Sequence, residues 1–140
     1  MAEIPKISTH EHYRAGGNLA AYFEVMPRFN IQKVIFVPTG GRPDNRGYEK
    51  HMAELLQVAK EYPERIIPYA SVDEADANAP QILEAAVKNG ARGLKLLGGH
   101  PNLYDEPLNS PKMMALFKKV QELKIPVLMH ISPIKIPKQL

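Results

Sequence analysis

Lys33-Val-Ile-Phe-Val-Pro-Thr39 is a short and nearly continuous run of β-branched and other apolar residues. A run of this kind is typical of a strand that is buried on both faces, as strands of parallel sheets are. Four further apolar runs are predicted to be strands as well, at residues 4–8, 65–71, 92–97 and 125–131. Pro68 fits a central strand poorly because proline cannot donate a ladder hydrogen bond, whereas Pro126 can stand where its strand begins.

Segments with a helical spacing of apolar residues separate these runs, at residues 18–28, 46–61, 79–89 and 111–123. Asn78 and Ser110 are placed to cap the last two helices, and Gly90 is placed to end the third. The predicted order is therefore β-α-β-α-β-α-β-α-β, in which strands recur about every 30 residues, the size of one βαβ unit. This alternation predicts an α/β protein with a parallel sheet. Two architectures fit it, an open doubly wound sheet and an incomplete (β/α)8 barrel.

The composition is that of an ordinary globular domain, with 140 residues of which 44% are hydrophobic and 24% are charged. We expect one domain over residues 1–140 and, without a signal-peptide pattern or a long apolar stretch, a cytoplasmic location. The absence of cysteine excludes disulfides and thiolate metal sites. The net charge is +3, and residues 111–140 hold six lysines and one acid. We interpret these lysines as a solvated face, so neither a nucleic acid nor a membrane is an expected partner.

Most of the candidate catalytic and metal-binding side chains lie at the ends of the predicted strands. Functional residues of parallel α/β proteins collect at the C-terminal ends of the strands. Four of the five histidines lie at or just after the end of an apolar run, namely His10, His12, His100 and His130, whereas His51 lies in a helix and is expected to pack or to face solvent. Residues 39–41, 71–74 and 98–99 add polar or flexible groups at strand ends, without either common phosphate-binding motif.

His10-Glu11-His12 is the sharpest of these features. Residues two apart on a strand point to the same face, so both imidazoles can reach one cation. Neutral histidine is the commonest metal ligand in proteins, and we interpret the pair as metal ligands, with an incidental surface pair as the alternative. His130 is a third candidate ligand, and its alternative is a core histidine that donates to a backbone carbonyl.

Lys95 lies in the apolar run Gly93-Leu-Lys-Leu-Leu97, where an unpaired charged amine would be costly to bury. Alternation puts Lys95 on the same side as Ala91 and Gly93, with room inside a barrel, and puts the flanking leucines against helices. Three roles compete for Lys95: a carboxylated lysine that bridges two metals, a cation for an anionic substrate, and a structural lysine.

The stretch Ile7-Ser-Thr-His-Glu-His-Tyr13 resembles the first-strand motif of the amidohydrolase superfamily. Gly90-Ala-Arg-Gly-Leu-Lys-Leu96 and Ile125-Pro-Val-Leu-Met-His130 resemble the fourth-strand and fifth-strand regions of its amidohydrolase-related branch. The resemblance covers essentially the whole chain. It implies an incomplete TIM-type (β/α)8 barrel with about five parallel strands, four crossover helices and a divalent metal, zinc or alternatively manganese, at its C-terminal mouth. It makes His10, His12 and His130 metal ligands and matches Lys95 to a fourth-strand lysine of the catalytic site.

The branch contains hydrolases, decarboxylases and hydratases that act on small carboxylated compounds. The resemblance therefore implies a metal-dependent hydrolase of a small carboxylated or cyclic amide, ester or lactone substrate. The alternatives are a decarboxylase or hydro-lyase, a non-catalytic half-barrel that binds metal or a partner, and a doubly wound binding domain with incidental histidines.

Two departures from the family pattern stand out. Ser8 occupies the place where the family often has an aspartate, and no residue matches the eighth-strand aspartate that serves as a base in the family. Five strands cannot close a barrel and leave two sheet edges unpaired, so we expect either association with another copy or a partner through those edges, or marginal stability.

Overall fold

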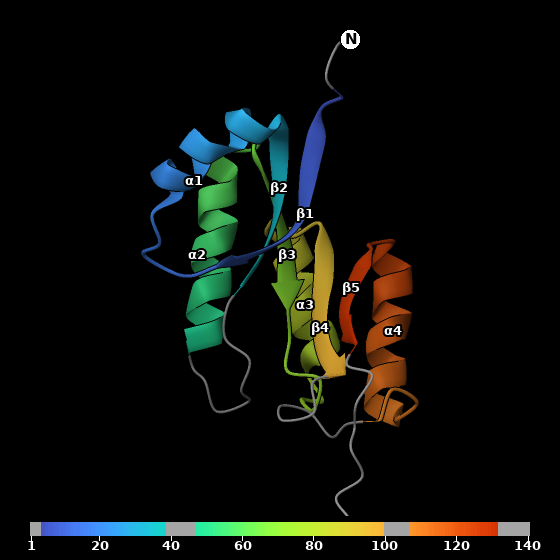
Figure 1. Ribbon diagram of the computed structural model, residues 1–140. Coiled ribbons are helices and arrows are strands. Elements are labelled where there is room, and N and C mark those ends of the chain that lie inside the picture. The colour runs from blue at the N-terminus through green and yellow to red at the C-terminus, as the bar shows by residue number, and fades with distance from the viewer. Residues whose placement is uncertain (1–3, 39–46, 100–106, 132–140) are drawn as a thin grey trace, which may run out of the picture.

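The computed structural model describes residues 4–38, 47–99 and 107–131 (Figure 1). The strands are β1 (Lys6–Tyr13), β2 (Ile31–Pro38), β3 (Ile66–Ser71), β4 (Gly93–Gly99) and β5 (Val127–Ile131). The helices are α1 (Leu19–Val25), α2 (Gly47–Glu61), α3 (Ala79–Lys88) and α4 (Pro111–Leu123), with the short 3-10 helix η1 (Met26–Phe29) directly after α1. No helix in these described ranges is long and apolar enough to cross a membrane.

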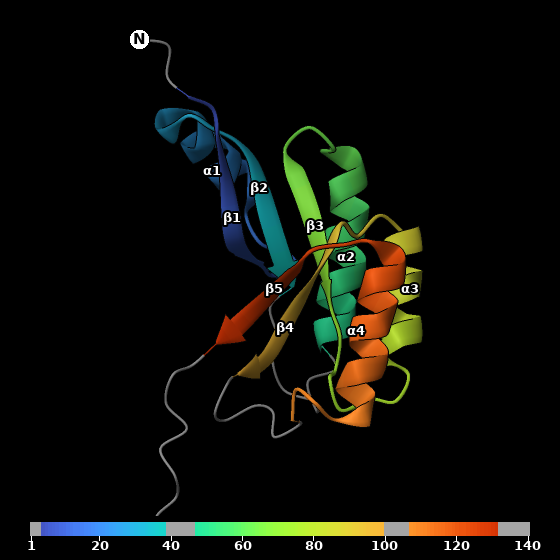
Figure 2. The ribbon, with the colours of Figure 1, turned by 90° about the vertical axis from the view of Figure 1, so that its right-hand side faces the viewer.

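The five strands form one sheet in the order β1-β2-β3-β4-β5, and every neighbouring pair is parallel. Each strand therefore lies beside the next one in the sequence, with helical crossovers in between. A doubly wound sheet would reverse its strand order at a switch point, so this alternative was wrong and the incomplete barrel is confirmed. Figure 2 shows α2, α3 and α4 together on one side of the sheet.

The core lies between the sheet and these helices. Leu94 and Leu96 of β4 are fully buried in a cluster with residues of α3 and α4, as the alternation around Lys95 predicts. A second cluster joins Tyr13 of β1 and Phe36 of β2 to Leu55 of α2. The inner face of the sheet, which carries Lys95 and the histidines of β1, is thus separate from the apolar core.

The first strand extends well beyond the predicted residues 4–8. It pairs with β2 as far as Tyr13, so His10 and His12 lie inside the strand rather than after it. The polar residues of this stretch have low strand propensity, but sheet pairing outweighs propensity where a neighbour is available.

Proline is accommodated at the start of a ladder in β3. The carbonyl oxygen of Pro68 accepts a hydrogen bond from the backbone N–H of Arg92, 2.8 Å away. The nitrogen and carbonyl of one strand residue point to the same side, so the nitrogen of Pro68 also faces β4. The recorded β3–β4 register begins one residue later, at Tyr69 and Gly93. Pro68 therefore stays in a central strand because it lies where that ladder begins. Pro126 directly precedes β5, as predicted.

The helix ends follow the sequence signals with two exceptions. Ser110 accepts a hydrogen bond from the N–H of Met113, and Gly90, just after the cap residue of α3, has a φ of +114°. Asn78 stands at the cap position of α3, but its side chain makes no capping hydrogen bond, so this part of the prediction was wrong. The predicted helix over 18–28 is divided. Helix α1 ends at Val25, and the 3-10 helix η1, with Pro27 in its first turn, follows directly.

Candidate metal site

Strand β1 presents different chemistry on its two faces. His10 and His12 are exposed on one face, whereas Glu11 and Tyr13 point toward the helices. The register with β2 shifts between Ser8 and Glu11. These residues are three apart on β1, whereas their partners on β2 are two apart. This bulge turns Ser8 and Glu11 to the same face, where the Ser8 hydroxyl donates to Glu11 Oε1 at 2.9 Å. Ser8 therefore supports Glu11 rather than a histidine.

The imidazoles of His10 and His12 lie side by side, with ring centroids 5.0 Å apart and ring planes tilted by 45°. Although both residues are exposed by surface area, partial burial of the rings lowers the pKa of both histidines, and the positive charge of Lys95 lowers it further. Both imidazoles are therefore favoured in the neutral form, whose lone pair can bind metal, while the charge of Lys95 itself repels a cation. The pair therefore fits part of a divalent-metal site.

Lys95 stands in the middle of the sheet on the same inner side. Its neighbours in register are Ser71 on β3 and Leu128 on β5, and its side chain is 3% exposed. Burial lowers its pKa, and the negative charge of Glu74 acts in the opposite direction. The positive charge of Lys95 acts on both histidines of β1, although β2 and β3 lie between β1 and β4 in the sheet.

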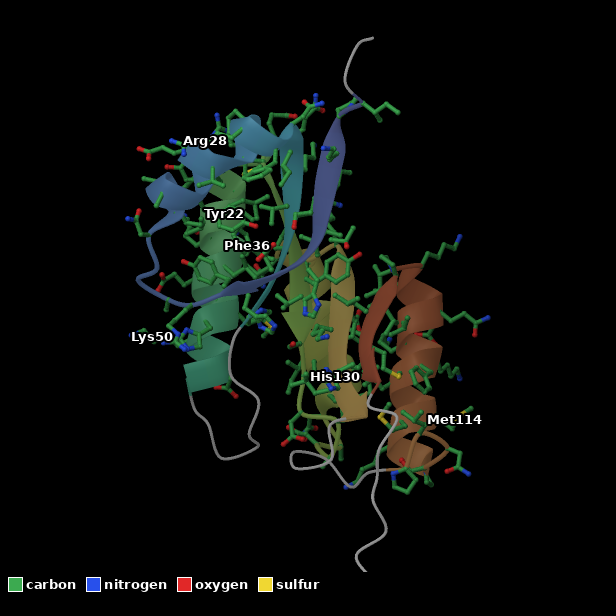
Figure 3. All side chains as sticks on the ribbon, in the orientation of Figure 1. Tyr22, Arg28, Phe36, Lys50, Met114 and His130 are labelled. Carbon is green, nitrogen blue, oxygen red and sulfur yellow. The ribbon has the colours of Figure 1, made fainter. Side chains whose placement is uncertain are left out.

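His130 lies on β5, near the end of that strand (Figure 3). Its charge makes a small contribution to the lowered pKa of His10, and β5 lies at the opposite edge of the described sheet from β1. Among the described residues, no group of three or more histidine, aspartate or glutamate side chains is arranged to hold a metal ion. The three-histidine ligand set therefore stays a prediction.

Glu74 is a residue that the sequence did not single out. It lies in the turn after β3, its side chain is 1% exposed, and its Oε1 accepts a hydrogen bond from the N–H of Leu97 on β4. The only sequence signal was its place in the polar run 71–74 at a strand end. Nothing in that run distinguishes a buried carboxylate from the exposed acids that are usual in such turns.

Helix α2 anchors the segment that follows His12. Glu54 Oε1 accepts hydrogen bonds from the Tyr13 hydroxyl at 2.7 Å and from the Gly16 N–H at 2.8 Å, and His51 Nδ1 accepts from the Ala15 N–H at 2.9 Å. Burial and the Glu54 carboxylate both raise the pKa of Tyr13. His51 thus has a packing role, as expected.

The predicted strand-end residues 39–41 and His100 lie outside the described residues.

The sequence profile of the amidohydrolase family matches residues 7–139. The chain belongs to the amidohydrolase family. The match begins at the start of β1 and extends past β5, so it includes both His10 and His130. No functionally curated protein sequence matches the chain.

Solved structures of this family share the fold. A probable 2-pyrone-4,6-dicarboxylic acid hydrolase from Acinetobacter baumannii, with citric acid bound, matches at 18% identity and a TM-score of 0.66, over 93% of this chain and 51% of its own. The 2,6-dihydroxybenzoate decarboxylase from Rhizobium matches at 17% identity and a TM-score of 0.74, over 96% and 52%. A dihydroxybenzoic acid decarboxylase from Polaromonas sp. JS666, with bound manganese and the inhibitor 2-nitroresorcinol, matches at 19% identity and a TM-score of 0.75, over 94% and 51%. The chain thus spans about half the length of these structures and has the fold of half a TIM barrel.

Proposed function

We propose that this chain supplies part of the active site of a divalent-metal-dependent hydrolase whose substrate is a small carboxylated compound with a cyclic amide, ester or lactone bond. The observation that carries the proposal is the side-by-side placement of His10 and His12 on the inner face of β1, within electrostatic reach of Lys95. This face is the one on which barrel enzymes assemble their ligands at the C-terminal ends of the strands.

His10 and His12 would hold the cation, and His130 would add a third nitrogen. Imidazole suits zinc, which is our first choice, and manganese is the alternative because the similar Polaromonas structure contains it. When bound, the cation supplies Lewis-acid activation of water or of a substrate carbonyl oxygen.

Lys95 would orient the substrate. Its positive charge acts on the histidine pair across β2 and β3, and an ammonium on this face attracts a carboxylate. Most of the Lys95 side chain is buried, so this attraction acts in a medium of lower dielectric than water. Lys95 thus supplies the selectivity for anionic substrates.

Decarboxylation is the second candidate function. The same arrangement would place the substrate carboxylate beside the cation site, and two of the structures described above are decarboxylases of hydroxylated benzoates. Both reactions need the same histidine pair but release different products. A half-barrel that binds metal or a partner without turnover is the non-catalytic alternative.

Metal binding tests the proposal directly. We expect calorimetric titration of the metal-free chain with Zn²⁺ and Mn²⁺ to show a site whose affinity falls about tenfold or more in His10→Ala and in His12→Ala, because each change removes a ligand. His51→Ala is the matched control, since His51 lies on α2 and accepts a backbone hydrogen bond there. Equal affinity in the wild type and in both β1 variants would contradict the proposal.

The two reactions are separated by their products. With metal present, turnover of 2-pyrone-4,6-dicarboxylate to a ring-opened acid would support lactone hydrolysis, whereas CO2 release from 2,6-dihydroxybenzoate would support decarboxylation. Metal binding without either reaction, in assays that include related lactones and benzoates, would favour the non-catalytic alternative.

A further inference from the structure

Glu74, in the turn after β3, and Lys95, inside β4, are both buried charged residues. Their exposures of 1% and 3% place both side chains almost entirely out of water, and among the described residues only Ser71 is another buried polar side chain. Removing a charge from water is costly unless an opposite charge or hydrogen bonds compensate for it. This burial therefore needs an explanation in terms of what each group does for the other.

The hydrogen bond of Glu74 fixes where its charge lies. Its carboxylate accepts from the N–H of Leu97, which is two residues beyond Lys95 on the same strand. The register also puts Ser71, the last residue of β3, opposite Lys95. Glu74 thus ties the turn after β3 to β4, two residues beyond Lys95.

The charges of Glu74 and Lys95 act on each other. The negative charge of Glu74 raises the pKa of Lys95, against the larger effect of burial, which lowers it. A carboxylated Lys95 would be an anion, and it would then lie near a buried carboxylate of the same sign. Like charges in a medium of low dielectric repel strongly, so Glu74 disfavours the carboxylated form and favours the cation.

We propose that Glu74 is a positioning residue that holds Lys95 of β4 as a cation, whose ammonium binds the carboxylate of the substrate. The inference rests on the proposed function for the identity of the bound group. The role of Glu74 is nevertheless separable from metal binding, because Glu74 acts through Lys95 and not through the histidines.

The central experiment compares Glu74→Gln with the wild type, using benzoate as the probe. Glutamine keeps an oxygen that can accept from Leu97 but removes the charge. We expect the benzoate affinity, measured by calorimetry at constant ionic strength, to fall about tenfold in Glu74→Gln and in Lys95→Gln. Glu84→Gln is the control, since Glu84 is a carboxylate of α3 that pairs with Lys88 and Lys119 on the outer surface.

A double-variant cycle shows whether Glu74 acts through Lys95. In a Lys95→Gln background we expect Glu74→Gln to change benzoate affinity no further, because the group that it holds is already absent. An unchanged benzoate affinity in Glu74→Gln, or a full additive loss in the double variant, would overturn the proposal. Mn²⁺ affinity is measured in parallel: its loss in the His10 and His12 variants tests the proposed function, and its retention in Glu74→Gln separates the two questions.

A measurement on the wild type keeps the proposal falsifiable if Glu74→Gln does not fold. Carboxylation would require the lone pair of a neutral Lys95 Nζ to bond to the carbon of CO2, with one C–O π pair moving to oxygen and an N–H proton passing to solvent. After incubation with ¹³C-labelled bicarbonate, with and without the diamagnetic ion Zn²⁺, we expect no carbamate carbon signal that depends on Lys95. Such a signal in the wild type, absent in Lys95→Gln, would overturn the proposal.

Discussion

At the residue scale, Gly93 shows how closely the inner face of the sheet is packed. It is buried, and a Cβ built on it would overlap the ring of Tyr69, its register partner on β3. The sequence suggested that Gly93 leaves room beside Lys95. The structure shows that the aromatic ring of Tyr69 occupies this room, so the glycine is required by a close contact and not by its backbone angles.

We expect Gly93→Ala to lower the free energy of unfolding by about 1–3 kcal/mol, because the ring of Tyr69 must move from its packed position. Urea denaturation would measure the change. In a Tyr69→Leu background the smaller side chain can move aside, so Gly93→Ala should lower the free energy of unfolding clearly less than it does in the wild type. An equal cost in both backgrounds would mean that the ring is not the obstacle.

Tyr22 supplies a second residue-scale prediction, on pH. Burial, followed by the hydrogen bond with Glu11, raises the pKa of Tyr22 to about 12 from an ordinary value of 10.0. Because the folded state then binds the phenol proton more tightly than the unfolded state, its stabilising contribution is complete below pH 10 and is lost as pH rises from 10 to 12. Urea denaturation between these limits should show a steeper fall for the wild type than for Tyr22→Phe. Parallel curves would contradict the linkage.

At the scale of the element, the two helices that were expected to have capping side chains differ in their actual caps. Ser110 Oγ accepts from the Met113 N–H at 3.2 Å, whereas Asn78 makes no such bond at the start of α3. Both caps precede a proline in the first turn, which makes them a matched pair. The difference arises because Ser110 has an extended backbone, with ψ at 156°, and Asn78, with ψ at 1°, does not.

We expect Ser110→Ala to lower the free energy of unfolding by about 1 kcal/mol and Asn78→Ala to have a much smaller effect, since only the first change removes a capping hydrogen bond. Thermal or urea denaturation of the two variants would measure this. A larger loss for Asn78→Ala would show that the cap of α3 forms in solution after all.

At the scale of the whole molecule, β1 and β5 are the edges of the sheet that the described residues form. The apolar side chains of Ile7 and Val127 on these strands are 52% and 37% exposed. An unpaired parallel edge with exposed apolar groups is a template for another strand. We propose that copies of this chain associate through these edges.

We expect Ile7→Lys and Val127→Lys to weaken self-association, measured by sedimentation velocity over a range of concentrations, because an edge lysine opposes strand pairing. Val25→Lys is the control, since Val25 is a similarly exposed apolar residue on α1 and not on an edge. A chain that is monomeric at every concentration, or an equal effect of the control, would exclude association through the edges.

The sequence by itself determined the order and type of the elements and, through its motifs, the family. These features depend on local patterns, because apolar runs and helical spacing record which faces are buried. The same holds for the His10–His12 pair, since residues two apart on a strand share a face. Local patterns left both a half-barrel and a doubly wound sheet open, and the strand order decided for the half-barrel. The bounds of β1, the cap at Asn78 and an unbroken helix over 18–28 were misjudged.

The tertiary structure decided what depends on distance between separate segments. It brought Glu74 from one turn against β4, placed Tyr69 over Gly93, and joined the Glu54 carboxylate of α2 to Tyr13. No local pattern marks such contacts, because a carboxylate in a turn looks the same in sequence whether it meets water or a buried strand end. The environment of Lys95 therefore became apparent only when the sheet put β3 and β4 side by side.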